Sequence, residues 1–210
     1  MDRVSDEIGD VLAGEIYVNA GLDPAQAPGA LRVATAVLGG SCLHAVARQD
    51  LPGRALLQRA GALWVIYYRE SLNSRQLNHA IAHELGEWFL RCRGYAEADV
   101  EELSSRVAAA ICVPRPAFMP AHRQYGEDLT RLSESFAVSE SLMALRIAEC
   151  LGPATALITR RVVRTRGEAH DWPGTREGWK ELVAQAREHP NGLSVRNVSD
   201  SKGRVILRFG

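Results

Sequence analysis

The segment from residue 79 to residue 87, His-Ala-Ile-Ala-His-Glu-Leu-Gly-Glu, constrains the fold of this chain more than any other stretch. The apolar residues in and around it recur at helical spacing: Leu77, Ile81, Leu85 and Trp88. His79, His83 and Glu87 form a second stripe, because residues four apart lie on one face of a helix. The pattern predicts a half-buried helix over residues 74–92 that carries metal-ligand side chains on one face.

His83 and Glu84 begin a pattern that is close to the H-E-x-x-H motif of zinc peptidases. In that motif two His side chains on one helix face hold a zinc ion, and the Glu is the general base. Here Glu87 stands in the position of the second His. The alternative interpretation is a half-buried helix with His and Glu on its surface, because a single H-E pair also arises by chance.

A second helix is expected to begin near Glu97, after a short turn that contains Gly94. It carries Glu101 and Glu102 and leads into an apolar run that ends at Pro114. An acidic residue on a following helix is the usual third ligand when the H-E motif belongs to a metal site. Prolines at 114, 116 and 120 are expected to break the chain after this helix.

These blocks resemble the ImmA/IrrE family of metallo-endopeptidases. Family members carry A-H-E-L-G-H, then an E-x-x-A-N-x-F-A-x-x-L-L-M-P-like helix, then L-A-x-x-F-x-V-S-x-x-x-x-x-x-R-L. Residues 82–86 fit the first block, and Glu101 with residues 107–114 fits the second. The third block is matched by Leu132, Phe136, Val138, Ser139 and Arg146. The resemblance covers roughly residues 60–150.

The resemblance implies a zinc site with Glu84 as general base and with His83, Glu87 and Glu101 as ligands. Glu87 departs from the family pattern, as do two serines at 104–105 in place of Ala-Asn. A carboxylate at 87 can bind zinc, but a second anionic ligand weakens the ion as a Lewis acid. An oxygen-richer site also favours harder ions, which makes manganese the alternative metal.

His79 is a further candidate ligand, since it lies one turn before His83 on the same face. If His79 and His83 were the ligand pair, Ala80 would stand in the position of the general base, and an alanine cannot take a proton. A shifted ligand pair would therefore bind metal without this mechanism. The alternative for His79 is an ordinary histidine at the helix surface.

The resemblance implies a regulator of a bacterium or mobile element that cuts a helix-turn-helix repressor. The predicted function is therefore a metal-dependent endopeptidase with a repressor-like protein substrate. The alternative is a pseudo-peptidase that senses a ligand or partner without cutting. Glu87 supports that alternative, whereas the retention of His83 and Glu84 opposes it.

The predicted fold class is α+β, with a small antiparallel sheet and a helical bundle that carries the zincin-like active-site helix. Short strands are expected at 43–47, 55–59 and 63–68, the last two as a hairpin, and an edge strand of such a sheet can pair with an extended substrate. Residues 1–150 are predicted to form the metallopeptidase-like domain, and residues 151–210 a small α+β appendage.

Two helices within residues 127–150 resemble a helix-turn-helix pair, which suggests DNA binding as a third hypothesis. Against it, Glu140 and Glu149 lie on the second helix, where Arg146 is the sole basic residue. The appendage holds eleven Lys and Arg against six Asp and Glu, a net charge of +5. A helix is expected at 176–188 and a hairpin at 193–209. The arginines of the appendage suit nucleic acid or an acidic protein face, and the alternative is a solvated strand face.

Composition suggests a cytoplasmic protein. The net charge is zero, and apolar residues make up 46% of the chain, enough for a core. No apolar run approaches the ~18 residues of a membrane helix. The first residues are acidic and lack the apolar core of a secretion signal. The four cysteines are far apart, which favours reduced thiols, and we expect a protein partner and no nucleic acid.

Overall fold

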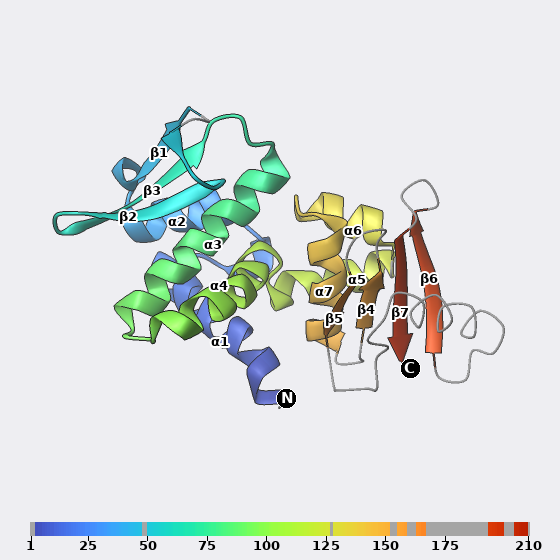
Figure 1. The fold of residues 1–210 in the computed structure, drawn as a ribbon. Helices are drawn as coiled ribbons and strands as arrows, with labels where there is room; N and C mark the ends of the chain where they lie inside the picture. The colour runs from blue at the N-terminus through green and yellow to red at the C-terminus, as the bar shows by residue number, and fades with distance from the viewer. Residues whose placement is uncertain are drawn as a thin grey trace. The chain divides into compact units, whose positions relative to one another are not determined.

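The computed structural model describes residues 3–47, 50–126, 128–151, 155–158, 163–166, 193–199 and 204–209. It has the predicted α+β class (Figure 1). The chain divides into two compact units, one formed by Glu7–Ser139 and the other by Met1–Asp6 with Glu140–Gly210. The predicted boundary between residues 150 and 151 stays a prediction.

The first unit contains a sheet of three strands, β1 (Leu43–Val46), β2 (Ala55–Ala60) and β3 (Leu63–Arg69), in the order β1–β3–β2. β2 and β3 form the predicted antiparallel hairpin. The expected antiparallel sheet is corrected at β1, which pairs with β3 in parallel, so the sheet is mixed. The reason is that β3 inserts between two strands that precede it in sequence, and strand patterns do not reveal such an insertion.

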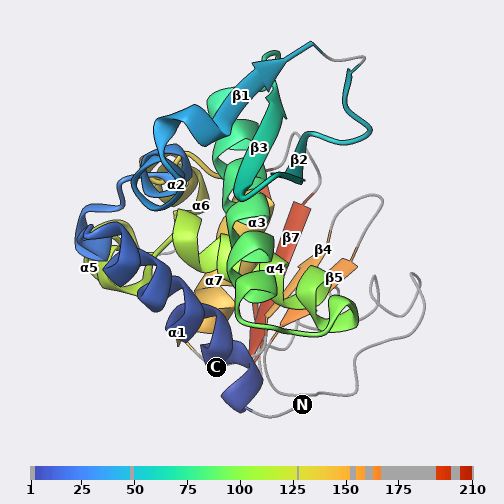
Figure 2. The same cartoon turned by 90° about the vertical axis from the view of Figure 1, so that its left-hand side faces the viewer.

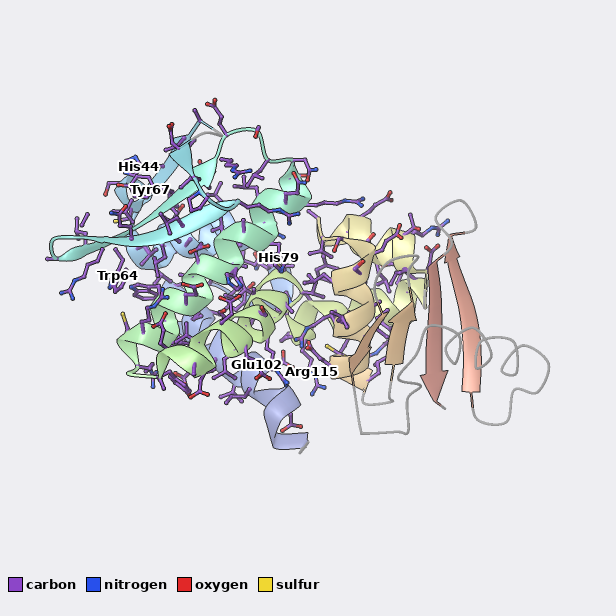
Figure 3. All side chains as sticks on the ribbon, viewed as in Figure 1. His44, Trp64, Tyr67, His79, Glu102 and Arg115 are labelled. Carbon is purple, nitrogen blue, oxygen red and sulfur yellow. The ribbon has the colours of Figure 1, made fainter. Side chains whose placement is uncertain are left out.

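The register of the sheet decides which side chains face the helices. Leu57 on β2 lies opposite Ile66 on β3, and both are buried. In the neighbouring row, His44 on β1 lies opposite Tyr67, and their rings stack with centroids 5.8 Å apart (Figure 3). Because side chains alternate between the faces of a strand, the two rows lie on opposite faces of the sheet.

The helices of the first unit are α1 (Arg3–Ala20, whose first residues belong to the second unit), α2 (Ala30–Leu38), α3 (Ser74–Cys92), α4 (Glu97–Cys112), α5 (Arg115–Tyr125) and α6 (Leu129–Ser135), with short 3-10 turns at Pro24–Gln26 and Gly40–Cys42. α3 lies between the sheet and α4 (Figures 1 and 2). Ile81 and Leu85 on α3 are fully buried, as the apolar stripe predicts. The helix begins after Asn73, which forms a capping box with Gln76.

α5 occupies the segment in which prolines were expected to break the chain. Pro114 is its N-cap residue, and Pro116 lies in its first turn. Backbone N–H groups in the first turn have no partner inside the helix, so proline costs little there. Pro120 alone lies in the helix interior and removes a single backbone hydrogen bond.

Asn78 on α3 connects three segments of the first unit. Its Oδ1 accepts from the backbone N–H of Ala30 at 2.8 Å, and its Nδ2 donates to the carbonyl of Phe136 at 3.2 Å. Asn78→Leu is expected to lower the free energy of unfolding by about 2–4 kcal/mol, because two partly buried backbone groups would lose their partners. Urea denaturation measures this loss. A loss no larger than that of the exposed cap variant Asn73→Ala would contradict the role of Asn78.

The second unit contains α7 (Glu140–Leu151) and a sheet of β4 (Thr155–Ile158), β5 (Val163–Arg166), β6 (Leu193–Ser199) and β7 (Arg204–Phe209). The strand order is β5–β4–β7–β6, and each neighbouring pair is antiparallel. β6 and β7 form the predicted C-terminal hairpin. The helix expected at 176–188 lies outside the described residues.

Candidate functional site

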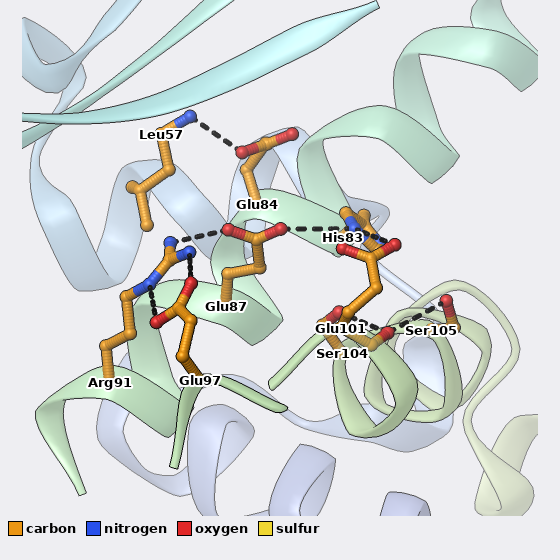
Figure 4. Close-up of polar contacts among 9 residues, drawn as sticks. All are labelled: Leu57, His83, Glu84, Glu87, Arg91, Glu97, Glu101, Ser104 and Ser105. Carbon is orange, nitrogen blue, oxygen red and sulfur yellow. Dashed lines mark hydrogen bonds and ion pairs between the residues drawn. The ribbon is translucent and has the colours of Figure 1, made fainter. Parts of the chain in front are cut away.

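His83 and Glu87 project from the same face of α3, as their spacing predicts. Nε2 of His83 lies 3.3 Å from Oε1 of Glu87 (Figure 4). Both side chains are mostly buried, with exposed fractions of 18% and 14%. The hydrogen bond to Glu87 raises the pKa of His83, and the same contact, with help from the Arg91 charge, lowers the pKa of Glu87. Each side chain of the pair therefore favours the charged form of the other.

Glu101 reaches the same place from α4. Its Oε1 lies 3.8 Å from Nε2 of His83, and its side chain is 79% exposed. One ligand atom from each of His83, Glu87 and Glu101 lies within 4.8 Å of the other two. The structure thus brings three of the predicted metal-site residues together, at a place that is open to solvent on the side of α4.

The close approach of α3 and α4 depends on Gly86. A Cβ atom at this position would lie 3.2 Å from the backbone oxygen of Ser104 and 3.4 Å from Cβ of Val107. Glycine therefore lets the two helix backbones approach closely beside the site. Ser104 also donates its hydroxyl to the backbone carbonyl of Glu101 at 3.0 Å. Ser104, which departs from the family pattern, thus lies one turn after Glu101 on α4 and contacts its backbone.

Glu84 points toward the sheet and not toward the other carboxylates (Figure 4). Its Oε2 accepts a hydrogen bond of 2.7 Å from the backbone N–H of Leu57 on β2. The residue is only 8% exposed. Burial, followed by the negative charge of Glu87, raises the pKa of Glu84 to about 7. Such a carboxyl group exchanges a proton near neutral pH, which is a property of general bases.

Arg91 and Glu97 extend the site and were not among the predicted residues. Nη1 of Arg91 lies 2.5 Å from Oε2 of Glu87, and Nη2 of Arg91 lies 2.7 Å from Oε1 of Glu97. The spacing of Glu87 and Arg91 is i, i+4, the favourable order for an acid–base pair on a helix. That spacing is a signal in the sequence that could have identified Arg91.

His79 lies beside the group formed by His83, Glu87 and Glu101 and is not part of it. Its ring stacks on that of His83 with centroids 6.4 Å apart and an interplanar angle of 19°. Figure 3 labels His79 on α3. Among the residues that the structure describes, the group that can hold a metal consists of His83, Glu87 and Glu101. Ligation by His79 stays a prediction.

The donor set suits a divalent metal. One imidazole nitrogen and two carboxylate oxygens are ligands that zinc accepts, and the distances among them allow one ion to touch all three. The high share of oxygen also suits manganese. The residues present therefore fit a resident metal ion, with Glu84 outside the ligand group on the side of β2.

The structure places a sheet beside a helix that carries an H-E motif, and a carboxylate from the next helix lies near that motif. These features are typical of a metallopeptidase-like class of protein. Residues 44–148, half of the chain, match the family model Peptidase_M78, described as the IrrE N-terminal-like domain. The chain belongs to this family, which confirms the resemblance seen in the sequence. Family membership supports a metallopeptidase-like or regulatory function.

In structure, the chain is similar to a Mycobacterium tuberculosis transcriptional regulator, with a TM-score of 0.60 and 13% sequence identity. The similarity covers 99% of this chain and 81% of that chain. At this level of identity the likeness shows the fold alone. The comparison with curated proteins gives no match. Among the described residues, no helix combines the length and apolar character needed to cross a bilayer.

Proposed function

We propose that this protein is a metal-dependent endopeptidase that cuts a helix-turn-helix transcriptional repressor in the bacterial cytoplasm. The observation that carries the proposal is the convergence of His83, Glu87 and Glu101 beside the buried carboxyl group of Glu84. Membership of the IrrE-like family supports a role in regulation. Zinc is the proposed metal, and manganese is the alternative.

His83 would hold the ion through Nε2, and Glu87 and Glu101 would each contribute Oε1. A bound ion would polarise the scissile carbonyl and make a water molecule easier to deprotonate. Glu84 would take the proton of that water and pass it to the leaving amine. The N–H of Leu57 orients the carboxylate of Glu84 for this role.

β2 offers a place for an extended substrate. It is an edge strand, and the N–H of Leu57 points away from β3, because it donates to Glu84. Backbone groups alternate in direction along a strand, so those of Ala55 and Arg59 share the outward side. Because the N–H of Leu57 already donates to Glu84, a peptide would pair with the outward groups of Ala55 and Arg59 and would pass directly beside Glu84.

The metal content of protein purified without chelator tests the proposal. We expect about one zinc or manganese ion per chain by elemental mass spectrometry, in line with the one ligand group found among the described residues. His83→Ala and Glu87→Ala are expected to lose the metal, since each removes one of three ligands. His44→Ala is the matched control, because it removes a histidine that lies on β1 and outside the ligand group. Retention of full metal by His83→Ala would exclude the proposed centre.

A pseudo-peptidase is the second candidate, and the contacts of Glu87 favour it. Both oxygens of this carboxylate already have partners, the imidazole of His83 and the guanidinium of Arg91. Such a network can stabilise the site without metal. A wild-type protein that takes up neither zinc nor manganese would support a binding protein on a peptidase fold.

The side chain of Arg146 weighs against DNA reading by α7. It is 1% exposed, and its Nη1 lies 3.2 Å from Oε2 of Glu149 on the same helix. A guanidinium in this position is withdrawn from phosphate groups. A protein substrate therefore remains the proposed partner.

A further inference from the structure

Glu87 has a charged neighbour that the H-E-x-x-H pattern does not require. Oε1 of Glu87 faces His83 at 3.3 Å, whereas Oε2 lies 2.5 Å from Nη1 of Arg91. The two oxygens of one carboxylate therefore have separate partners (Figure 4). The oxygen held by Arg91 is the one on the side away from the proposed metal position.

Arg91 is itself held in place by Glu97 at the start of α4. Nη2 of Arg91 lies 2.7 Å from Oε1 of Glu97, and Nε lies 3.4 Å from Oε2. A guanidinium engaged at two points by a planar carboxylate has a defined orientation. Arg91 is half-buried, with 27% of its side chain exposed, and its contacts with Glu87 and Glu97 hold the guanidinium beside Glu87.

Building on the proposed function, we propose that Arg91 is a positioning residue that makes Glu87 a one-oxygen, charge-compensated metal ligand. Oε2 stays on the guanidinium, and only Oε1 is presented to an ion held by His83 and Glu101. The pair Glu87–Arg91 thereby takes the place of the neutral second histidine in the H-E-x-x-H pattern. Glu97 supports this role because it fixes Arg91.

The charges around the site explain why such compensation matters. One imidazole and two carboxylates cancel both charges of a divalent ion, whereas two imidazoles and one carboxylate leave one positive charge. The guanidinium of Arg91 places one positive charge directly beside Glu87, whereas the carboxylate of Glu97 that offsets it is 76% exposed and therefore screened by solvent. Without Arg91, Glu87 would offer two oxygens, and the oxygen-richer site would shift the preference from zinc toward manganese. Arg91 is therefore expected to set metal preference.

A double-mutant cycle tests this role without an activity assay. The dissociation constants of zinc and of manganese are measured by competition with a chromophoric chelator. The four proteins are the wild type, Arg91→Gln, Glu87→His and the double variant. In the wild-type background, Arg91→Gln is expected to lower the preference for zinc over manganese about tenfold, as is typical when a ligand loses its hydrogen-bond partner.

In the Glu87→His background, the same change at Arg91 is expected to alter that preference less than about twofold. An imidazole at position 87 has no second oxygen for Arg91 to hold. Equal shifts in both backgrounds, or no shift in either, would overturn the inference. Arg93→Gln is the matched control, because it removes a guanidinium whose partners are Glu15 and the ring of Phe89.

The outcomes separate this inference from the proposed function. A wild type that binds neither ion overturns the proposed function and the role of Arg91 together. A wild type that binds zinc with no dependence on Arg91 overturns the inference alone. Glu97→Gln provides a second variant at an exposed position, where the fold is expected to survive. Glu97→Gln is expected to lower the preference for zinc over manganese by less than Arg91→Gln does. A higher preference for zinc in this variant would contradict the role of Arg91.

Discussion

Glu84→Gln is expected to lower the rate of peptide cleavage by about 10²–10⁴-fold, the usual contribution of a general base. The same substitution is expected to stabilise the metal-free protein above pH 7. Gln is neutral at every pH, and its carbonyl oxygen can still accept the hydrogen bond from Leu57. The variant would therefore lose the proton acceptor and also the cost of a buried charge.

The direction of the pH effect follows from the raised pKa of Glu84. Its pKa is about 7 in the folded protein, against an ordinary value of 4.5. Below the ordinary value the group is protonated in both states, and the full stability is present. As the pH rises through 7, stability is lost, because the unfolded chain ionises this group without the cost of burial. A shift of this size corresponds to roughly 3 kcal/mol.

Urea unfolding in the presence of a chelator measures this effect. The free energy of unfolding of Glu84→Gln is expected to exceed that of the wild type by an amount that grows between pH 5 and pH 8. Glu134→Gln removes an exposed carboxylate on α6, and its free energy of unfolding relative to the wild type should not change with pH in this way. A difference that stays constant with pH would contradict the raised pKa. Undiminished cleavage of internally quenched peptides by Glu84→Gln would exclude Glu84 as the base.

Gly86→Val is expected to destabilise the protein by about 3 kcal/mol, because the added carbons would press on the backbone of α4. The Cβ alone would lie 3.2 Å from the oxygen of Ser104, and the two γ carbons extend further. A displaced α4 would also carry Glu101 away from His83. Zinc affinity is therefore expected to fall at least about tenfold along with the stability.

Urea unfolding and zinc titration of Gly86→Val check the two effects separately. Gly14→Val on α1 is the matched control, since a Cβ at that helical glycine would meet no atom within 4 Å. Gly14→Val is expected to change the free energy of unfolding by less than about 1 kcal/mol. Its zinc affinity is expected to equal that of the wild type. If Gly86→Val behaved like Gly14→Val, the close approach of α3 and α4 would not position Glu101.

The sequence by itself determined the local parts of this protein. The range of α3 and the common face of His83 and Glu87 follow from helical periodicity, which depends only on residues three and four positions apart. The contact between Glu87 and Arg91 has the same spacing and was equally readable. The hairpin of β2 and β3 was predictable too, because a short turn joins the two strands.

The tertiary structure alone decided what long-range packing controls. The parallel pairing of β1 with β3 depends on which strand lies in the middle of the sheet, and neighbours in sequence do not reveal it. The meeting of Glu101 with His83 depends on how closely α4 approaches Gly86. The raised pKa of Glu84 arises because the chain folds β2 over it and removes water, an effect that no spacing along α3 could show.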